Sequence, residues 1–218
     1  MSFDSVRARI ASAAVRAGRS KDSVRLVVVS KGQSLTAIRD LYDRGHRDFG
    51  ENRAQELAAK VDQLPADIVW HFVGPLQSNK VRTVRGAVGL LHSLDRADLV
   101  PAWVKGPGAP PPALVQVRIG GEEQKHGVDP SEALALCERA RVAGIEVTGL
   151  MTIPPVVGHP AEARPYFDQL VAVATEVRET MPAVRELSMG MTDDFEVAIE
   201  AGATIVRIGR AIFEELPN

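Results

Sequence analysis

Eight short apolar runs alternate with helix-like stretches along this chain, and no other feature constrains the fold as strongly. Such alternation is typical of parallel strands joined by crossover helices. We expect strands at residues 25–30, 47–49, 68–73, 88–92, 113–119, 146–151, 187–188 and 204–208. Eight strand–helix units in about 190 residues predict a compact (β/α)8 barrel of the TIM type. An open doubly wound sheet is the alternative that a strand count leaves open.

No domain linker interrupts the pattern, so residues 1–218 are predicted to form a single domain, with residues 1–20 as an extra helix packed on the barrel. That first helix is amphipathic and lacks the apolar core of a signal peptide. No apolar run approaches the ~20 residues of a membrane span. The net charge of −2, without a basic tract, argues against nucleic acid and anionic membranes as partners. The single cysteine, Cys137, reads as a core residue and fits a reducing cytoplasm.

The carboxyl ends of barrel strands carry the functional residues, and the first strand, RLVVVS, ends at Lys31. The end of a valine-rich strand partly desolvates an amine, which favours the neutral form that adds to an aldehyde. A solvent-exposed loop lysine is the alternative. The choice between the two depends on the companion residues at the other strand ends.

A glycine turn follows the expected eighth strand in the segment IGRAIF. The backbone amides of Gly209 and Arg210, at the start of a helix, would point toward a bound anion. Ser188, Met189 and Gly190 follow the seventh strand and add a hydroxyl and further amides. Either turn alone is an ordinary connection. Together with the strand-end lysine they predict one ligand that carries an aldehyde and a phosphate, and pyridoxal 5′-phosphate (PLP) is the leading candidate.

Three further side chains fit such a ligand, each with an alternative. Arg207 lies inside the eighth strand and could donate to the pyridine nitrogen, which would stay largely unprotonated because arginine accepts no proton. It could instead face outward and pair with a helix carboxylate. Asn52 could bond the phenolic oxygen or cap the next helix, and His71 could be structural. The five histidines show no metal-ligand spacing, so we expect no metal site.

Six motifs, in this order and spacing, resemble the pyridoxal phosphate homeostasis protein family: VSK, FGEN, WHFVGPLQSNK, GLMTIP, LSMGMTDDFEVAIEAG and VRIGRAIF. The family is a single-domain relative of the alanine racemase N-terminal barrel, the type III fold of PLP proteins. The resemblance implies that PLP is bound as an internal aldimine on Lys31. It also implies the remaining cofactor contacts: Arg207 at the ring nitrogen, Asn52 and Met151 beside the ring, and Ser188, Met189, Gly209 and Arg210 around the phosphate.

Two stretches depart from the family pattern. Arg210 stands where a small hydroxyl residue is common, so the phosphate would lose a hydroxyl contact and gain a charge. Residues 117–127 match the family only loosely.

The resemblance implies a PLP carrier or buffer involved in vitamin B6 homeostasis, without established turnover. A PLP-dependent amino-acid racemase is the rival, and a regulatory barrel that senses phosphate metabolites is a third reading. Racemisation needs acid–base groups on both faces of the substrate carbon, and in related racemases the second is a tyrosine from a further domain. Here the sequence ends five residues after Phe213, and its two tyrosines, Tyr42 and Tyr166, lie in helical patterns away from the strand ends. We therefore expect a non-catalytic, monomeric carrier whose partners are PLP and PLP-dependent apoenzymes.

Overall fold

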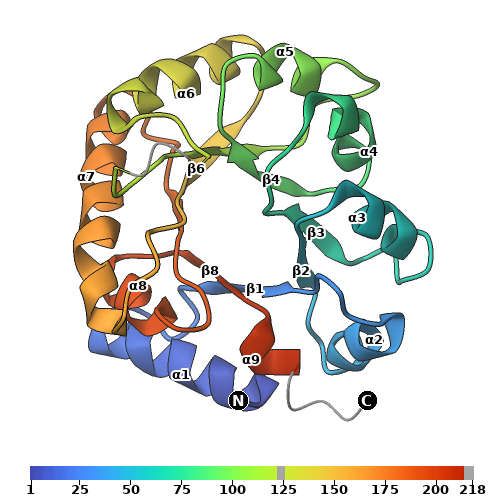
Figure 1. Ribbon diagram of the computed structural model, residues 1–218, viewed down its shortest axis with the longest axis vertical. Coiled ribbons are helices and arrows are strands. Elements are labelled where there is room, and N and C mark those ends of the chain that lie inside the picture. Colours follow the sequence, from blue (N-terminus) through green and yellow to red (C-terminus); the bar gives the residue numbers. More distant parts are fainter. Residues whose placement is uncertain (122–125, 214–218) are drawn as a thin grey trace.

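The computed structural model describes residues 1–121 and 126–213, in which eight parallel strands pair in chain order as a closed barrel (Figure 1). The strands are β1 Arg25–Val29, β2 Asp48–Glu51, β3 Val69–Phe72, β4 Leu90–Leu94, β5 Ala113–Gln116, β6 Val147–Met151, β7 Glu186–Ser188 and β8 Ile205–Ile208. Because β8 pairs with β1, the sheet has no free edge. The predicted (β/α)8 barrel is confirmed, and the open doubly wound alternative is wrong.

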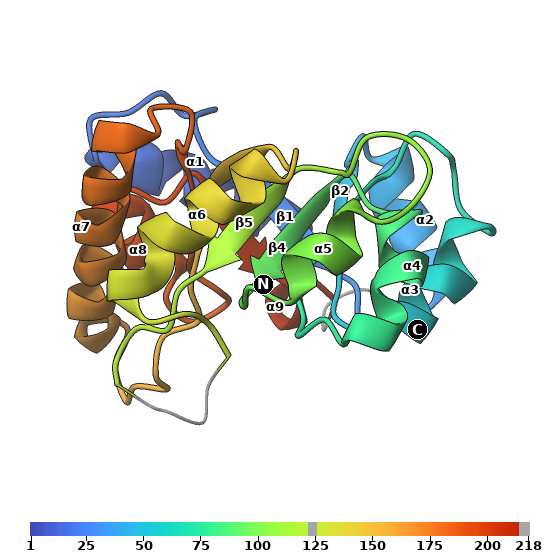
Figure 2. The same cartoon turned by 90° about the horizontal axis from the view of Figure 1, so that it is seen from above.

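Helices surround the barrel on all sides (Figure 1). They are α1 Phe3–Arg16, α2 Leu35–Asp43, α3 Ala54–Val61, α4 Val81–Arg85, α5 Leu99–Val104, α6 Ala133–Val142, α7 Arg164–Thr180, α8 Phe195–Ala201 and α9 Arg210–Phe213, with 3₁₀ turns at Ser78–Lys80, Pro130–Glu132 and Pro160–Ala163. Seen from above, α7 and α8 lie on one side of the barrel and α2, α3 and α4 on the other (Figure 2). The Ser34 hydroxyl caps α2 by accepting from the Ala37 amide, as its position predicted.

The first helix, α1, lies beside α8 (Figure 1). Its buried face includes Val6 and Ile10, and Arg9 forms a 2.6 Å ion pair with Glu196 of α8. Both charged side chains are partly exposed, so the pair adds little to stability, and the apolar face supplies most of the packing energy.

Strand alternation divides the buried apolar residues between two layers. Outward residues such as Leu26 and Val28 pack against the helices. Inward residues form a separate small core inside the barrel: Val27, Leu90, Leu114, Met151 and Ile205. In β1 the odd-numbered residues therefore point inward, and this register decides which side chains reach the open end of the barrel.

The proline-rich segment at residues 106–112 connects α5 to β5 and therefore lies at the amino-terminal end of the strands, away from the carboxyl ends. The buried Arg85 fixes this segment by donating to the carbonyl oxygens of Trp103, Pro107 and Gly108 at 2.7–2.8 Å. Over the residues described, no helix is long and apolar enough to cross a bilayer.

Candidate functional site

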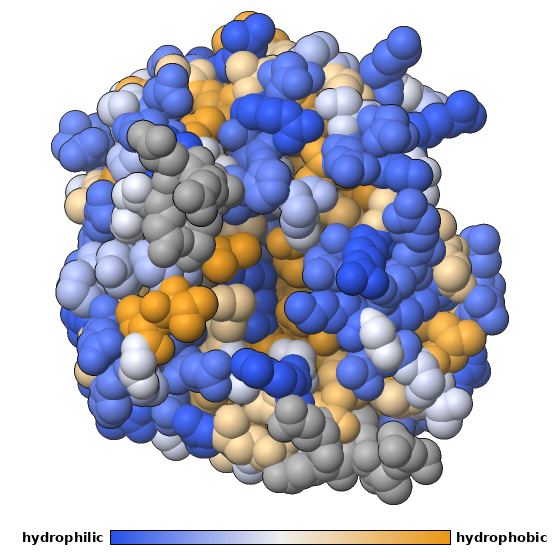
Figure 3. Space-filling model, in the orientation of Figure 1, coloured by the Kyte–Doolittle hydropathy of each residue, from blue (hydrophilic) through white to orange (hydrophobic). Residues whose placement is uncertain are grey.

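The carboxyl ends of the strands meet on one face of the barrel, which we call the mouth. Figure 3 looks onto this face and shows a hollow near its centre, with hydrophilic and hydrophobic residues on its walls. Lys31 follows β1 two positions after Val29, in a turn where the Gln33 amide donates to the Ser30 carbonyl oxygen. Its side chain is exposed, so the expected partial desolvation of its amine is wrong for the protein without ligand, and the amine is accessible at the mouth.

A buried ion pair fixes the backbone before that lysine, and a separate carboxylate fixes the backbone after it. Lys60 of α3 donates to Glu51 Oε1 at 2.6 Å and to the Ser30 carbonyl oxygen at 2.7 Å, and the Ser30 hydroxyl donates to the same carboxylate. On the other side, the Gly32 amide donates to Glu56 Oε2 at 2.7 Å. Burial raises the pKa of Glu51, and the bonds from Lys60 and Ser30 oppose this shift. The loop is therefore fixed from outside the barrel, while the lysine side chain remains free.

Arg207 points into the barrel and is only 4% exposed. Its guanidinium donates to the Ser188 hydroxyl at 2.7 Å and to the Thr152 carbonyl oxygen at 2.9 Å. Burial lowers its pKa to about 10, and the nearby Asp194 carboxylate opposes that shift. At neutral pH the side chain remains a cation with further N–H donors available. The alternative of an outward arginine paired with a helix carboxylate is wrong.

The turn from β8 into α9 presents unused amides. Within the described part of the chain, the backbone N–H groups of Gly209, Arg210 and Ala211 make no hydrogen bond. A Cβ at Gly209 would lie 2.6 Å from the Val29 carbonyl oxygen, so the close approach of β8 and β1 at the mouth requires glycine. The Arg210 side chain is exposed and pairs with Asp193 at 3.2 Å. Its charge therefore lies on the rim.

Asn52 follows β2 and has a buried side-chain oxygen without a hydrogen-bond partner. It does not cap α3, because Arg53 occupies the N-cap position and makes no side-chain capping bond. The capping alternative for Asn52 is therefore wrong. A buried acceptor without a partner is costly, and Asn52 is best explained by a ligand that bonds its amide group.

We expect Asn52→Ala to leave the free energy of unfolding of the ligand-free protein within about 0.5 kcal/mol of the parent, because no protein hydrogen bond is lost. The same change should weaken binding of a mouth ligand about tenfold through the lost amide contact. Urea unfolding and an equilibrium titration with PLP measure the two quantities. A large loss of stability with unchanged affinity would show that Asn52 is structural.

The other expected site residues occupy different surroundings. Met151 is buried in the inner core of the barrel. Met189 is buried in the outer core and its amide donates to the Ile205 carbonyl oxygen. The Ser188 hydroxyl is fully buried and bonded inside the barrel. Three neighbouring strands, β8, β1 and β2, contain or directly precede Arg207, Gly209, Lys31 and Asn52. Met151, Ser188 and Met189 lie instead at the ends of β6 and β7.

Not all of the side chains that contact and position the site residues were identified from the sequence. Lys60 was not singled out, although a carboxylate inside a strand followed nine residues later by a lysine in a helix is a detectable signal. Asp48 was also missed as a member of the site's surroundings. A charged residue in an apolar strand pattern is the corresponding signal.

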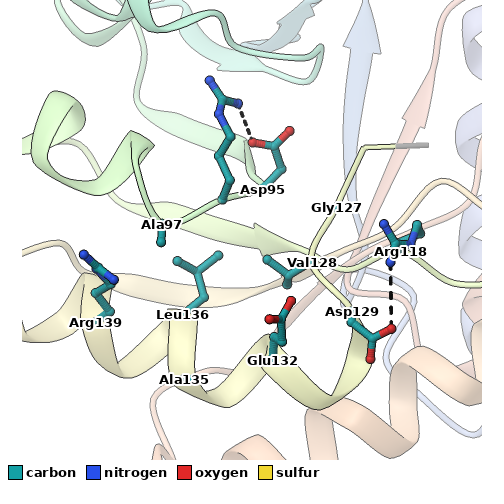
Figure 4. Close-up of a pocket in the computed structure, with 11 residues that line it drawn as sticks. Asp95, Ala97, Arg118, Gly127, Val128, Asp129, Glu132, Ala135, Leu136 and Arg139 are labelled. Carbon is teal, nitrogen blue, oxygen red and sulfur yellow. Dashed lines mark hydrogen bonds and ion pairs between the residues drawn. The ribbon is translucent and has the colours of Figure 1, made fainter. Parts of the chain in front are cut away.

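A second pocket, of about 360 Å³, lies beside the mouth between β4, β5 and α6 (Figure 4). Its charged walls are partly self-neutralised, since Arg96 lies 2.7 Å from Asp95 and Arg118 lies 3.8 Å from Asp129. None of the predicted cofactor residues lines it. Residues 122–125 of the loosely matching 117–127 stretch lie outside the described residues.

The described parts of the chain support neither a cysteine nucleophile nor a metal site. Cys137 is buried in α6, and burial raises the pKa of its thiol to about 12, which suits a core residue rather than a nucleophile. Among the described residues, no cluster of three or more histidine, cysteine or acidic side chains has the arrangement of a metal site.

No protein-family model matches the chain. The pyridoxal phosphate homeostasis protein of Aquifex aeolicus is 44% identical to it over 213 residues, which cover 95% of this chain and 93% of that protein. The chain belongs to the pyridoxal phosphate homeostasis protein family. The resemblance carried by the six sequence motifs is therefore confirmed.

Solved structures agree with this membership of the pyridoxal phosphate homeostasis protein family. PipY from Synechococcus elongatus PCC7942, solved with PLP bound, is 33% identical with a TM-score of 0.77, and the match covers 95% of this chain and 99% of PipY. The structure of PipY without PLP gives a TM-score of 0.82 at 34% identity over the same shares. Lysine/ornithine decarboxylase from Vibrio vulnificus, at 16% identity, shares the fold with a TM-score of 0.67 over 94% of this chain and 60% of its own.

Proposed function

We propose that this protein binds PLP in the barrel mouth and serves intracellular PLP homeostasis without catalytic turnover. One observation carries the proposal: an exposed lysine amine at the end of β1, on a backbone fixed on both sides, in a chain 33% identical over nearly its full length to a PLP-bound relative.

The residues at the mouth fit the chemical groups of PLP one by one. The cofactor supplies an aldehyde, to which the Lys31 amine adds with loss of water to give a C=N link. The side-chain amide N–H of Asn52 fits the phenolic oxygen as a donor. The unused N–H groups of Gly209 and Arg210 fit the phosphate, and the Arg207 guanidinium fits the ring nitrogen as a donor.

Met151, Met189 and Ser188 complete the proposed cofactor site from the β6 and β7 side. Met151 would form the apolar floor beneath the ring. For Met189 we propose an indirect role, because its side chain packs in the outer core. Ser188 is proposed to act through its hydroxyl, which Arg207 contacts.

Arg207 also favours storage over turnover. An arginine at the ring nitrogen donates a hydrogen bond but takes no proton, so the ring remains a weaker electron sink than one facing a carboxylate. Its pKa, lowered to about 10 by burial, still leaves it cationic at neutral pH. This is the chemistry of a carrier that releases an unchanged cofactor.

A PLP-dependent amino-acid racemase is the second candidate, and one tyrosine favours it. Tyr42 donates to Asp67, which precedes β3 at the amino-terminal end. Tyr166, however, packs beside the loop after β5, where its ring lies 3.2 Å from the Cβ position of Gly120. Tyr166 therefore lies in α7 beside the loop that follows β5.

Turnover assays separate the two candidates. PLP-loaded protein is incubated with L-alanine, L-lysine and L-ornithine, and D-enantiomers and released CO₂ are measured against the same concentration of free PLP. We expect no rate above that of free PLP. A faster rate that Tyr166→Phe abolishes would establish an enzyme and overturn the carrier proposal.

We further propose that the carrier is a cytoplasmic monomer that passes PLP to apoenzymes, in line with its single buried cysteine. Sedimentation analysis tests the oligomeric state. Transfer is tested by mixing loaded protein with a PLP-dependent apoenzyme and an excess of a PLP-trapping amine. Activation despite the trap supports direct transfer, and its absence indicates release into solution.

A further inference from the structure

A chain of four hydrogen bonds crosses the interior of the barrel and ends on Arg207. Asp48 Oδ1 lies 3.0 Å from His71 Nε2, and His71 Nδ1 lies 2.9 Å from His92 Nε2. His92 Nδ1 lies 2.8 Å from the Ser188 hydroxyl, which accepts from Arg207 at 2.7 Å. The five residues come from β2, β3, β4, β7 and β8, so the chain spans the barrel interior.

Only one end of this chain reaches solvent. His71, His92 and Ser188 are fully buried, and Arg207 nearly so. Asp48 is the first residue of β2, at the amino-terminal end of the barrel, and its side chain is 28% exposed. Arg25, the first residue of β1, lies 3.9 Å from the same carboxylate oxygen. The chain therefore connects the end of the barrel opposite the mouth with the arginine proposed to face the cofactor.

With each histidine ring neutral, the direction of every bond follows from the two ends. A carboxylate only accepts, so His71 must carry its proton on Nε2. Neutral His71 then accepts on Nδ1 from His92 Nε2–H, and neutral His92 accepts on Nδ1 from the Ser188 O–H. Arginine only donates, so Ser188 accepts from Arg207. All donors point from the mouth toward Asp48.

The charges around the chain agree with neutral His92. Burial lowers the pKa of His92 well below its ordinary value, and the charges of the neighbouring Arg207 and Arg25 act in the same direction. Burial alone would raise the pKa of Asp48, but the hydrogen bond from His71, together with the charge of Arg25, outweighs it and lowers that pKa. Asp48 thus remains an anion that accepts.

We propose that Asp48 is a positioning residue that acts through His71 and His92 to fix the Ser188 hydroxyl as the acceptor that holds Arg207 for the cofactor ring. The proposal deepens the PLP-binding function proposed above and rests on it. With Asp48 present, the Ser188 hydroxyl donates its hydrogen to His92 Nδ1. If the chain were reversed, His92 would donate through Nδ1 and Ser188 would be free to donate into the mouth, where it would compete for the cofactor.

The first test measures histidine tautomers in the ligand-free protein by ¹⁵N NMR, and so needs no PLP. In the parent protein, His71 and His92 should both carry hydrogen on Nε2 only. Asp48→Leu removes the acceptor, so both rings should shift to the Nδ1–H tautomer. Arg25→Gln is the matched control, because it removes the ion-pair partner of Asp48 and leaves the chain intact. A parent His92 protonated on Nδ1 would overturn the proposal.

Ser188→Ala tests which end sets the direction, and it remains informative if Asp48→Leu does not fold. If Asp48 governs the chain, His92 in this variant keeps its hydrogen on Nε2. A shift to Nδ1–H would show that Ser188 and Arg207 set the direction from the mouth, and would contradict the proposal.

A second readout is the dissociation constant for PLP, followed by absorption. Asp48→Leu should raise it about tenfold, whereas Arg25→Gln should change it less than about twofold. If the parent binds no PLP while the tautomers behave as expected, the proposed function fails and the account of chain direction stands. If PLP binds equally to all variants, the positioning role fails and the proposed function stands.

Discussion

Lys60→Met is expected to lower the free energy of unfolding by about 3–5 kcal/mol at neutral pH. The change leaves the Glu51 carboxylate, whose side chain is 0% exposed, without its counter-ion 2.6 Å away. It also removes the donor to the Ser30 carbonyl oxygen. Breaking one partner of a buried pair is more damaging than removing both, because the remaining charge cannot regain its hydration.

The loss should depend on pH in a defined direction. Burial already raises the pKa of Glu51 in the folded protein, and removing Lys60 deletes the main opposing influence, so the variant's pKa rises further. A raised folded-state pKa gives stability that is present below the ordinary glutamate value of about 4.3 and is lost as the pH rises through the folded-state value. The difference between parent and variant should therefore shrink from pH 7 to pH 5.

Urea unfolding at the two pH values measures this effect. The double variant Glu51→Gln/Lys60→Met is the control, because the neutral amide still accepts from Ser30 and leaves no buried charge. It should recover most of the lost stability at pH 7 and show little pH dependence. A double variant as unstable as Lys60→Met would contradict the account of a buried, unpaired carboxylate.

Lys31→Ala should abolish the visible absorption band of PLP-loaded protein and raise the PLP dissociation constant about 100-fold or more, equal to about 2.7 kcal/mol. The C=N link between amine and aldehyde accounts for the loss. Folding should be unaffected, because the side chain is exposed and its loop is fixed by Ser30 and Gly32. Spectrophotometric titration with PLP gives both quantities.

Two further variants test whether PLP binding requires the reactive amine of Lys31 rather than only a positive charge or another lysine. Lys31→Arg keeps the positive charge near the phosphate but does not become neutral near pH 7, so it should also lose the band. Lys80→Ala removes another lysine that follows a barrel strand and should leave band and affinity unchanged. A normal band in Lys31→Arg would show that Lys31 does not form the link.

Local patterns in the sequence were sufficient to predict the barrel. Alternation of strands and helices depends on neighbouring residues, and the first strand was expected at 25–30 and found at Arg25–Val29. The fourth was displaced, from an expected 88–92 to Leu90–Leu94, and its pairing with β5 shifts register between Leu91 and Leu94. Such a shift is set by the neighbouring strand, which a local pattern does not contain.

The site residues on the strand ends were predictable for the same reason, since a strand end is visible in the sequence. Arg207 could be placed in a strand but not oriented, and its inward direction follows from the register of β8 against β1. The contacts behind the site were not predictable. His92 and Ser188 are 96 residues apart in the chain, and they meet only because the barrel closes.

The most direct test of the central claim is reduction of the PLP-loaded protein with borohydride, followed by tryptic digestion and mass spectrometry. Reduction makes the link permanent and blocks cleavage after the modified lysine, so we predict a pyridoxyl phosphate group on Lys31 in the peptide 26–39. Modification of a different lysine, or of none in protein saturated with PLP, would contradict the claim that Lys31 anchors the cofactor in the mouth of the barrel.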